Sequence, residues 1–192
     1  MKKVILGQAA EISSGLVINR YNIQKKVSNL KKHYLYHQIT LKSVENKNID
    51  LTLLEEFQSE RKIDERYLLR EGDVIMKLTP PYNAALVDFQ CENLVVPQYF
   101  AIIRPRNNFD PQYITYILNS KNVQKQLHRL VEGGSLQTIK ISSLNTVKIN
   151  QIEIDEQIKY GKLFSLLSQR KELKKRNIEL EELLMEDILT NL

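Results

Sequence analysis

The chain has 192 residues, with 28 Lys and Arg against 23 Asp and Glu, a formal net charge of +5, six glycines, five prolines and one cysteine. This composition excludes collagen-like, low-complexity and disulfide-stapled proteins, which need far more Gly, Pro or Cys. No apolar run approaches the roughly 18 residues of a membrane span, and residues 1–15 lack the features of a secretory signal. We therefore expect a cytoplasmic, globular protein with no membrane partner and with a core that needs neither metal nor disulfides.

The excess of positive charge lies near the N-terminus. Residues 156–192 carry seven basic and seven acidic side chains, whereas residues 1–47 carry nine Lys or Arg against two Glu, a local charge of +7. In residues 1–47 these cations stand among Tyr, Asn, Gln and His side chains, so groups suited to phosphates lie beside groups suited to base edges. The pattern is compatible with nucleic-acid binding, although proteins that bind no nucleic acid also carry basic stretches.

Several short strands are predicted before residue 110. Residues 34–41 alternate with the period of a half-buried strand, and residues 74–78 follow a Gly-Asp turn and stop at two prolines. Residues 84–89 and 94–103 are further strand candidates, and Pro97 makes the latter an edge or bulged strand. We expect a twisted, mostly antiparallel sheet or a small barrel.

A helical insert is predicted after these strands. Asp110 and Pro111 indicate a helix start, because Asp can accept free backbone amides of the first turn and Pro at the first helical position loses no needed donor. Apolar residues then follow with helical spacing until a Gly-Gly pair ends the run. Two short helices, or one helix broken near Asn119, both fit this pattern. Residues 135–154 suit a loop and a closing strand.

One long helix is predicted from Asp155, as N-cap, to about Leu189, because this segment contains no proline and a single glycine. A helix of about 34 residues would span roughly 50 Å at about 1.5 Å per residue, so we expect it to project from the rest of the chain. Its apolar stripe needs a partner helix in the same chain, in a second copy or in another protein. The seam positions are Leu163, Leu166, Leu173, Asn177, Leu180, Leu184 and Ile188. Asn177 is either a register-setting polar residue or a solvated one.

No catalytic constellation stands out. Residues 79–82, Thr-Pro-Pro-Tyr, resemble a motif of amino-methyltransferases, but a threonine replaces the essential amide or carboxylate. The strand, Gly-rich turn and helix of a nucleotide-like cofactor site are also absent from the pattern. Cys91 has no evident base beside it, and the three histidines are not spaced as a zinc site. We therefore expect a chain that is not an enzyme and that needs no cofactor and no metal.

A series of short segments, taken in order, resembles the DNA-specificity subunit of type I restriction-modification systems. The segments are LGQAAEISSG at 6–15, LREGDVI at 69–75, VPQY at 96–99, DPQYI at 110–114, GGS at 133–135, ISSL at 141–144, TVKI at 146–149 and DEQ at 155–157. Each segment alone is unspecific. Their order and spacing across nearly the whole chain carry the resemblance.

The resemblance implies an α+β fold. A β-rich target recognition domain with short helices, residues 1–152, would be followed by a long C-terminal coiled-coil helix, residues 153–192, that acts as spacer and dimerisation region. Members of the family recognise double-stranded DNA and position the methyltransferase (M) and restriction (R) subunits, and they typically contain two recognition domains and two such helices. This chain has one of each. We therefore expect a homodimer with antiparallel C-terminal helices that reads a bipartite, inverted-repeat site.

The residues expected to contact DNA carry cationic, hydroxyl or amide groups. They are Arg20, Lys25, Lys26, Lys31 and Lys32 for phosphates, and Lys77, Thr79, Tyr82, Asn83, Ser135, Gln137, Thr138 and Lys140 in two further segments. The alternative from a different class is a coiled-coil adaptor that binds no DNA. Salt-dependent retention on mixed duplex DNA separates the two hypotheses.

Overall fold

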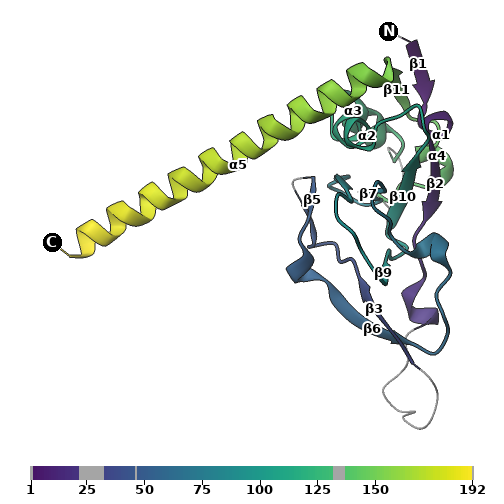
Figure 1. The fold of residues 1–192 in the computed structure, drawn as a ribbon, viewed down its shortest axis with the longest axis horizontal. Helices are drawn as coiled ribbons and strands as arrows, with labels where there is room; N and C mark the ends of the chain where they lie inside the picture. Colours follow the sequence, from purple (N-terminus) through teal and green to yellow (C-terminus); the bar gives the residue numbers. More distant parts are fainter. Residues whose placement is uncertain (1, 22–32, 46, 132–136, 192) are drawn as a thin grey trace.

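The computed structural model describes residues 2–21, 33–45, 47–131 and 137–191 (Figure 1). Its β-rich part, here called the head, extends to Glu153 and is followed by the helix α5 (Ile154–Thr190). Figure 1 shows α5 projecting far beyond the head, with only its first turns beside it. The predicted architecture, a β-rich region with short helices followed by one long helix, is confirmed.

The centre of the head is a four-stranded antiparallel sheet. Its strands, in spatial order, are β2 (Ala10–Ser14), β10 (Phe100–Pro105), β7 (Val74–Lys77) and β8 (Ala84–Leu86). A second sheet contains β6 (Glu55–Ser59), β3 (Tyr34–Gln38) and β9 (Leu94–Val95), and its β3–β9 pair is parallel. The mostly antiparallel character that the sequence predicts is confirmed, and the β3–β9 pair is the exception within the described residues.

Two small strand pairs and several short helices complete the head. The strand pairs are β1 (Lys2–Ile5) with β11 (Lys148–Gln151), and β4 (Val44–Glu45) with β5 (Asn48–Ile49). The α-helices are α1 (Leu6–Ala9), α2 (Pro111–Leu118), α3 (Lys121–Arg129) and α4 (Ile141–Leu144), and the 3₁₀ helices are η1 (Ile18–Arg20), η2 (Leu51–Leu53) and η3 (Glu65–Tyr67). Among the described residues, no helix is both long enough and apolar enough to cross a bilayer.

Both faces of the central sheet are buried. Val74 and Met76 of β7 pack toward one core that includes α2 and α3 residues, whereas Ile75 between them packs into a second core. The alternation follows from the two-residue period of a strand, which sends neighbouring side chains to opposite faces. A third cluster, centred on Tyr36 and Phe57, joins the second sheet to the chain after β2.

The prediction of one strand over residues 94–103 is wrong. The segment forms β9 and β10, which belong to different sheets. Between them the Phe100 N–H donates to the Pro97 carbonyl over 3.0 Å, so the chain turns at this point. Proline lacks the N–H that a continuous central strand would use in its ladder.

The helical insert begins where the sequence predicts. The Asp110 carboxylate accepts the Tyr113 N–H at 2.7 Å, and Pro111 occupies the first turn of α2. Of the two alternatives, the structure has two helices: the Ser120 hydroxyl caps α3 by accepting the Val123 N–H. Local side-chain chemistry therefore determines both helix starts.

Helix α5 begins slightly earlier than predicted. Its N-cap is Glu153, not Asp155, because the Glu153 carbonyl already accepts the N–H groups of Glu156 and Gln157. Asp155 and Glu156 lie in the first turn, where negative charge interacts favourably with the helix dipole.

Candidate DNA interface and helix seam

Two of the segments predicted to contact DNA lie side by side in the head. The loop from β7 to β8 contains Thr79 and Asn83, and it contacts the chain that leads into α4. The Ile139 N–H donates to the Leu78 carbonyl at 2.8 Å, and the Tyr82 hydroxyl donates to the Gln137 carbonyl at 3.1 Å. Residues from separate parts of the sequence thus form one surface.

The exposed part of this surface includes polar groups and one cation beside Pro80 and Pro81. Gln137, Thr138 and Lys140 are exposed, and Thr79 and Asn83 are half-buried. Hydroxyl and amide side chains with a nearby ammonium group are suited to both phosphate oxygens and base edges.

Lys77 and Tyr82 do not lie on this surface. The Tyr82 ring is buried in the main core and packs edge-on against His128. Lys77 ends β7 as a buried residue, and desolvation lowers the pKa of its ammonium group, although the charge of Glu45 acts in the opposite direction. Their polar character suggested exposure, but both belong to elements whose neighbours cover them.

Arg20 is exposed at the end of η1, whose Ile18 packs against the Tyr36 and Phe57 cluster rather than the main core. Lys25, Lys26, Lys31, Lys32 and Ser135 lie outside the residues that the structure describes.

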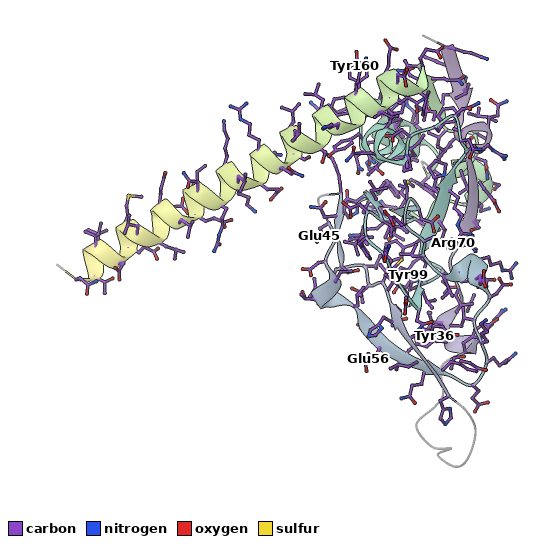
Figure 2. All side chains as sticks on the ribbon, in the orientation of Figure 1. Tyr36, Glu45, Glu56, Arg70, Tyr99 and Tyr160 are labelled. Carbon is purple, nitrogen blue, oxygen red and sulfur yellow. The ribbon has the colours of Figure 1, made fainter. Side chains whose placement is uncertain are left out.

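The seam of α5 is exposed to solvent over its whole length. The leucines at 163, 166, 173, 180 and 184 and Ile188 are between 47% and 71% exposed, and Asn177 is exposed as well. Figure 2 shows the distal side chains of α5 extending into open space, away from the head. Such a stripe of apolar side chains on an isolated helix is typical of a surface that pairs with another helix.

The first turns of α5 are joined to the head through the opposite face. Gln157 is fully buried; its amide group donates to the carbonyls of Asn108 and Ile152 and accepts the Asp110 N–H. Gly161 is also buried, and a Cβ at this position would lie 2.9 Å from an Asp110 carboxylate oxygen. At about 100° per residue, Gln157 lies roughly 180° around the helix from Leu166. The head therefore leaves the seam uncovered.

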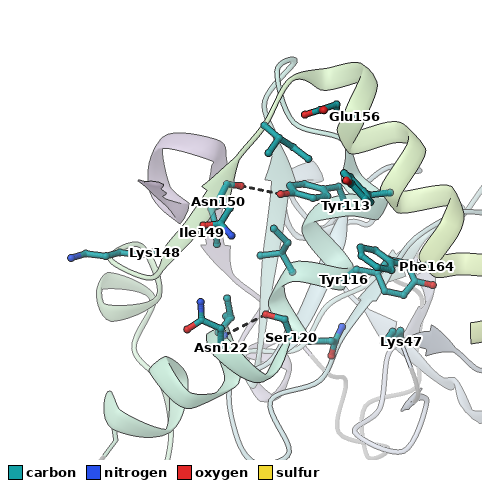
Figure 3. A pocket seen from close by; sticks show the side chains of 15 residues that line it. Lys47, Tyr113, Tyr116, Ser120, Asn122, Lys148, Ile149, Asn150, Glu156 and Phe164 are labelled. Atoms are coloured by element: carbon teal, nitrogen blue, oxygen red, sulfur yellow. Dashed lines mark hydrogen bonds between the residues drawn. The ribbon is translucent and has the colours of Figure 1, made fainter. Parts of the chain in front are cut away.

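A second contact joins α5 to the turn between β4 and β5. The Lys47 ammonium group lies 3.3 Å from the Ser168 hydroxyl and 4.6 Å from the centre of the Tyr116 ring. Burial lowers the pKa of Lys47, and the charge of Lys171 lowers it further. Lys47 borders a cavity of about 710 Å³ that Tyr116 and Phe164 also line, as Figure 3 shows.

Sequence reasoning assigned no role to Lys47, Gln157 or Gly161. Gln157 was part of a segment that carried the family resemblance, but two of its three hydrogen bonds reach Asn108 and Asp110, 49 and 47 positions away, which no spacing pattern indicates. The single glycine in a long amphipathic helix was the available signal for a close helix contact at Gly161.

Among the residues that the structure describes, no group of three or more His, Cys, Asp or Glu is arranged to hold a metal ion. The one thiol, Cys91, is half-buried and donates to the Leu69 carbonyl. Burial raises its pKa, and the charges of Asp73 and Glu71 add to that shift. A raised thiol pKa opposes formation of the nucleophilic thiolate.

No protein-family model matches the chain, and no curated protein matches it by sequence. Solved structures do match. The HsdS subunit from Thermoanaerobacter tengcongensis superimposes with a TM-score of 0.65 at 20% identity, over 93% of this chain and 45% of that one. A structure described under the complex assembly and conformational transition of the type I R-M system gives 0.66 at 18% identity, over 94% and 45%.

The type I restriction-modification S subunit from M. genitalium gives a TM-score of 0.53 at 15% identity, over 89% of this chain and 40% of that one. The chain therefore spans less than half the length of each of these structures. At these identities the likeness is one of fold. The fold that the family resemblance implies is confirmed: this chain has the head and long helix found in type I specificity subunits.

Proposed function

We propose that the chain is a DNA-specificity subunit of a type I restriction-modification system and has no catalytic step of its own. The observation that carries the proposal is the combination of a compact head with a projecting helix whose apolar seam is exposed, in the fold shared with HsdS. The helix has 37 residues, so much of its length extends beyond the part that the head covers.

The head is the part that would bind duplex DNA. The adjoining loop and segment supply Thr79, Asn83, Gln137, Thr138 and Lys140, and Arg20 adds a cation at η1. In the proposed interface the Lys and Arg side chains contact phosphates, and the amides and hydroxyls near them read base edges. The basic residues of segment 22–32 and Ser135 remain part of the proposed contact set by their chemistry.

The helix would serve as spacer. Two copies that pair antiparallel through their seams place their heads at opposite ends of the pair, related by a two-fold axis. Each head then contacts one half-site of an inverted repeat, and the helices determine the gap between the half-sites. The complete assembly would include methyltransferase and restriction subunits, which supply the chemistry.

The first test is sequence selection with the full chain. A pool of duplexes with randomised positions is bound at about 50 mM salt, and the retained DNA is sequenced. We expect two conserved half-sites in inverted orientation, separated by unconserved positions. Duplex DNA that is not retained even at this low salt would refute the proposal and favour the coiled-coil adaptor, because phosphate contacts bind most strongly there. Retention without an enriched sequence would also refute a specificity subunit.

The second test measures the phosphate contacts. Lys140→Gln removes one exposed cation of the proposed interface, and Lys175→Gln removes one from the outer face of α5. We expect Lys140→Gln to reduce the slope of log affinity against log salt by about 1, with the preferred sequence unchanged. Lys175→Gln should leave the slope unchanged. Equal effects of both substitutions would contradict the assignment of the interface to the head.

A further inference from the structure

The exposed seam of α5 contains two opposite charges among its apolar residues. A seven-residue repeat places Leu163, Arg170, Asn177 and Leu184 at one core position and Leu166, Leu173, Leu180 and Asp187 at the other. A charged side chain that enters a helix interface is unfavourable unless an opposite charge or a hydrogen bond compensates it. The positions of Arg170 and Asp187 therefore restrict how two helices can pair.

The chain itself leaves these charges available. Within the described part of α5, the ion pairs are Lys175–Glu179 and Arg176–Glu179, on the side away from the seam centre. Asp187 accepts an amide hydrogen bond from Asn191 of the same helix, and no cation lies within ion-pair distance of it in the described residues.

The residues beside the seam also alternate in charge. On one side the flanking positions are Leu167, Lys174, Glu181 and Ile188, so the repeat places Ile188, which the sequence analysis assigned to the seam, beside it. In an antiparallel pair, these positions of one helix face the same set on the other helix, so a residue meets a copy of itself or of another member of this set. Each position of the two-fold axis along α5 gives one register, that is, one alignment of the two helices. Charge complementarity between the two copies can therefore be tested for each register.

One register satisfies both sets of charges. We propose that two copies of this chain pair antiparallel with the two-fold axis between Ile178 and Glu179, an inference that rests on the pairing proposed above. Arg170 then faces the partner's Asp187, and Leu173 faces the partner's Leu184. Beside the seam, Lys174 faces the partner's Glu181, and Leu167 faces the partner's Ile188. Symmetry produces each of these contacts twice.

The alternative registers either bring like charges together or leave Arg170 without an acid. With the axis moved to Lys175, Lys174 and Arg176 each face their own copy. With the axis moved to Glu182, Glu181 faces its own copy, and Arg170 lies beyond the end of the partner's helix. With the axis between Lys171 and Glu172, Arg170 faces the partner's Leu173 without an acid. Each alternative loses the contacts of Arg170 with Asp187 and of Lys174 with Glu181, and the first two also place like charges opposite one another, which is destabilising.

Asn177 fits the same register without an unsatisfied amide. It lies next to the axis and faces the partner's Leu180, while its side chain donates to Glu181 of its own helix over 3.3 Å. A single polar seam residue of this kind opposes pairings that would bury it elsewhere.

The register determines the distance between the two heads. Gly161, where α5 contacts α2 of the head, lies about 17 residues from the axis, so the two copies of Gly161 are about 52 Å apart at about 1.5 Å per residue. This is the length of about 15 base pairs of duplex at about 3.4 Å each. A shift by one register changes the separation by about 10 Å, or about three base pairs.

Disulfide trapping tests the register directly. In the full chain with Cys91→Ser, the double variant Lys174→Cys/Glu181→Cys places a cysteine opposite a cysteine at two symmetric contacts. We expect most of the protein to migrate as a covalent dimer after mild oxidation, and each single variant to remain largely monomeric on a non-reducing gel. Efficient crosslinking of Lys174→Cys alone, or of Glu181→Cys alone, would identify a neighbouring register and overturn the proposal. Absence of crosslinking in the double variant would also overturn it.

Charge exchange gives an independent test that needs no cysteine. Lys174→Glu and Glu181→Lys should each raise the dimer dissociation constant about tenfold, because two attractive contacts become repulsive. The double variant should return it to within about threefold of the original value. Lys171→Glu, which lies outside the seam on the side of α5 that faces Lys47, is the control and should change the dimer dissociation constant little. Failure of the double variant to restore dimerisation, or a chain that is monomeric at tens of micromolar by sedimentation, would refute this register.

These measurements separate the register from the proposed function. A correctly trapped dimer that selects no DNA would refute the DNA-specificity role while the register stands. Selection of a bipartite site by a dimer that crosslinks through a single cysteine would refute the register and leave the role intact.

Discussion

Gln157 should be the main polar contact that holds α5 to the head. Its fully buried amide makes three hydrogen bonds of 2.8 to 3.1 Å, with the backbone at Asn108, Asp110 and Ile152. Each such bond contributes about 1 kcal/mol net, and Gln157→Ala removes all three of them. We therefore expect a loss of about 3 kcal/mol in the free energy of unfolding, with a further contribution from the void.

The assay is urea unfolding of the full chain at one fixed concentration, since pairing of chains would make stability depend on concentration. Gln169→Ala, an exposed position on the same helix, is the matched control and should stay within about 0.5 kcal/mol of the parent. A loss below about 1 kcal/mol for Gln157→Ala, or equal losses for both variants, would refute the reasoning. Either result would mean that the three hydrogen bonds of Gln157 do not hold α5 to the head.

Three further predictions concern the head. Gly15→Ala should prevent or severely weaken folding, because a Cβ there would lie 2.1 Å from the Pro97 carbonyl oxygen; circular dichroism of the purified variant checks this, and a parent-like melting temperature would contradict it. Tyr36→Phe should cost about 1 to 3 kcal/mol in urea unfolding, because the Ile63 N–H loses the hydroxyl that accepts it at 3.0 Å; an unchanged midpoint would contradict the assignment. Arg104→Met should cost about 2 to 4 kcal/mol at pH 8, because it leaves buried Asp73 without its ion-pair partner at 3.0 Å. Burial already raises the pKa of Asp73 in the folded chain, and loss of Arg104 raises it further. Protonation of Asp73 therefore favours the folded state, so the loss in the free energy of unfolding should become smaller toward pH 5. A loss that becomes larger toward pH 5 would contradict this reasoning.

The features that the sequence predicts well are those with local causes. The long helix follows from a segment with no proline and a single glycine, and the start of α2 follows from an Asp-Pro pair that caps the helix. The conformation of residues 94–103 depends instead on contacts with residues that are far away in the sequence. Val96 accepts the Leu16 N–H at 2.7 Å, so this stretch is held by the chain after β2 and not by a single strand ladder.

Some of the segments that carry the family resemblance contact one another. Gly15 from the first lies against Pro97 from the third, and Gly7 N–H donates to the Asn145 carbonyl beside the segment 146–149. These segments therefore identify the fold more directly than the DNA sequence read. Individual base contacts could not be predicted, because direct readout depends on loop geometry and on the shape of the duplex.

Residue type also did not predict which of the candidate DNA contacts are exposed. Residue type alone selected both Tyr82, which is buried, and Thr138, which is exposed. A hydroxyl or an ammonium group in a loop shows that the side chain is polar, but it does not show whether the side chain is exposed. Exposure depends on which side chains the neighbouring helices and strands cover. Burial of Tyr82 follows from its contact with α3 through His128, which lies 46 positions further along the chain.

The pairing of β1 with β11 brings the entry and the exit of the head together. Lys2 stands opposite Gln151, three residues before the first residue of α5, so both strands meet the helix at one place (Figure 1). Insertions, deletions or replacement of the sequence between these two strands can therefore change the surface of the head without displacing α5. Under the proposed function, this layout would allow the DNA target to change while the pairing of the C-terminal helices stays the same.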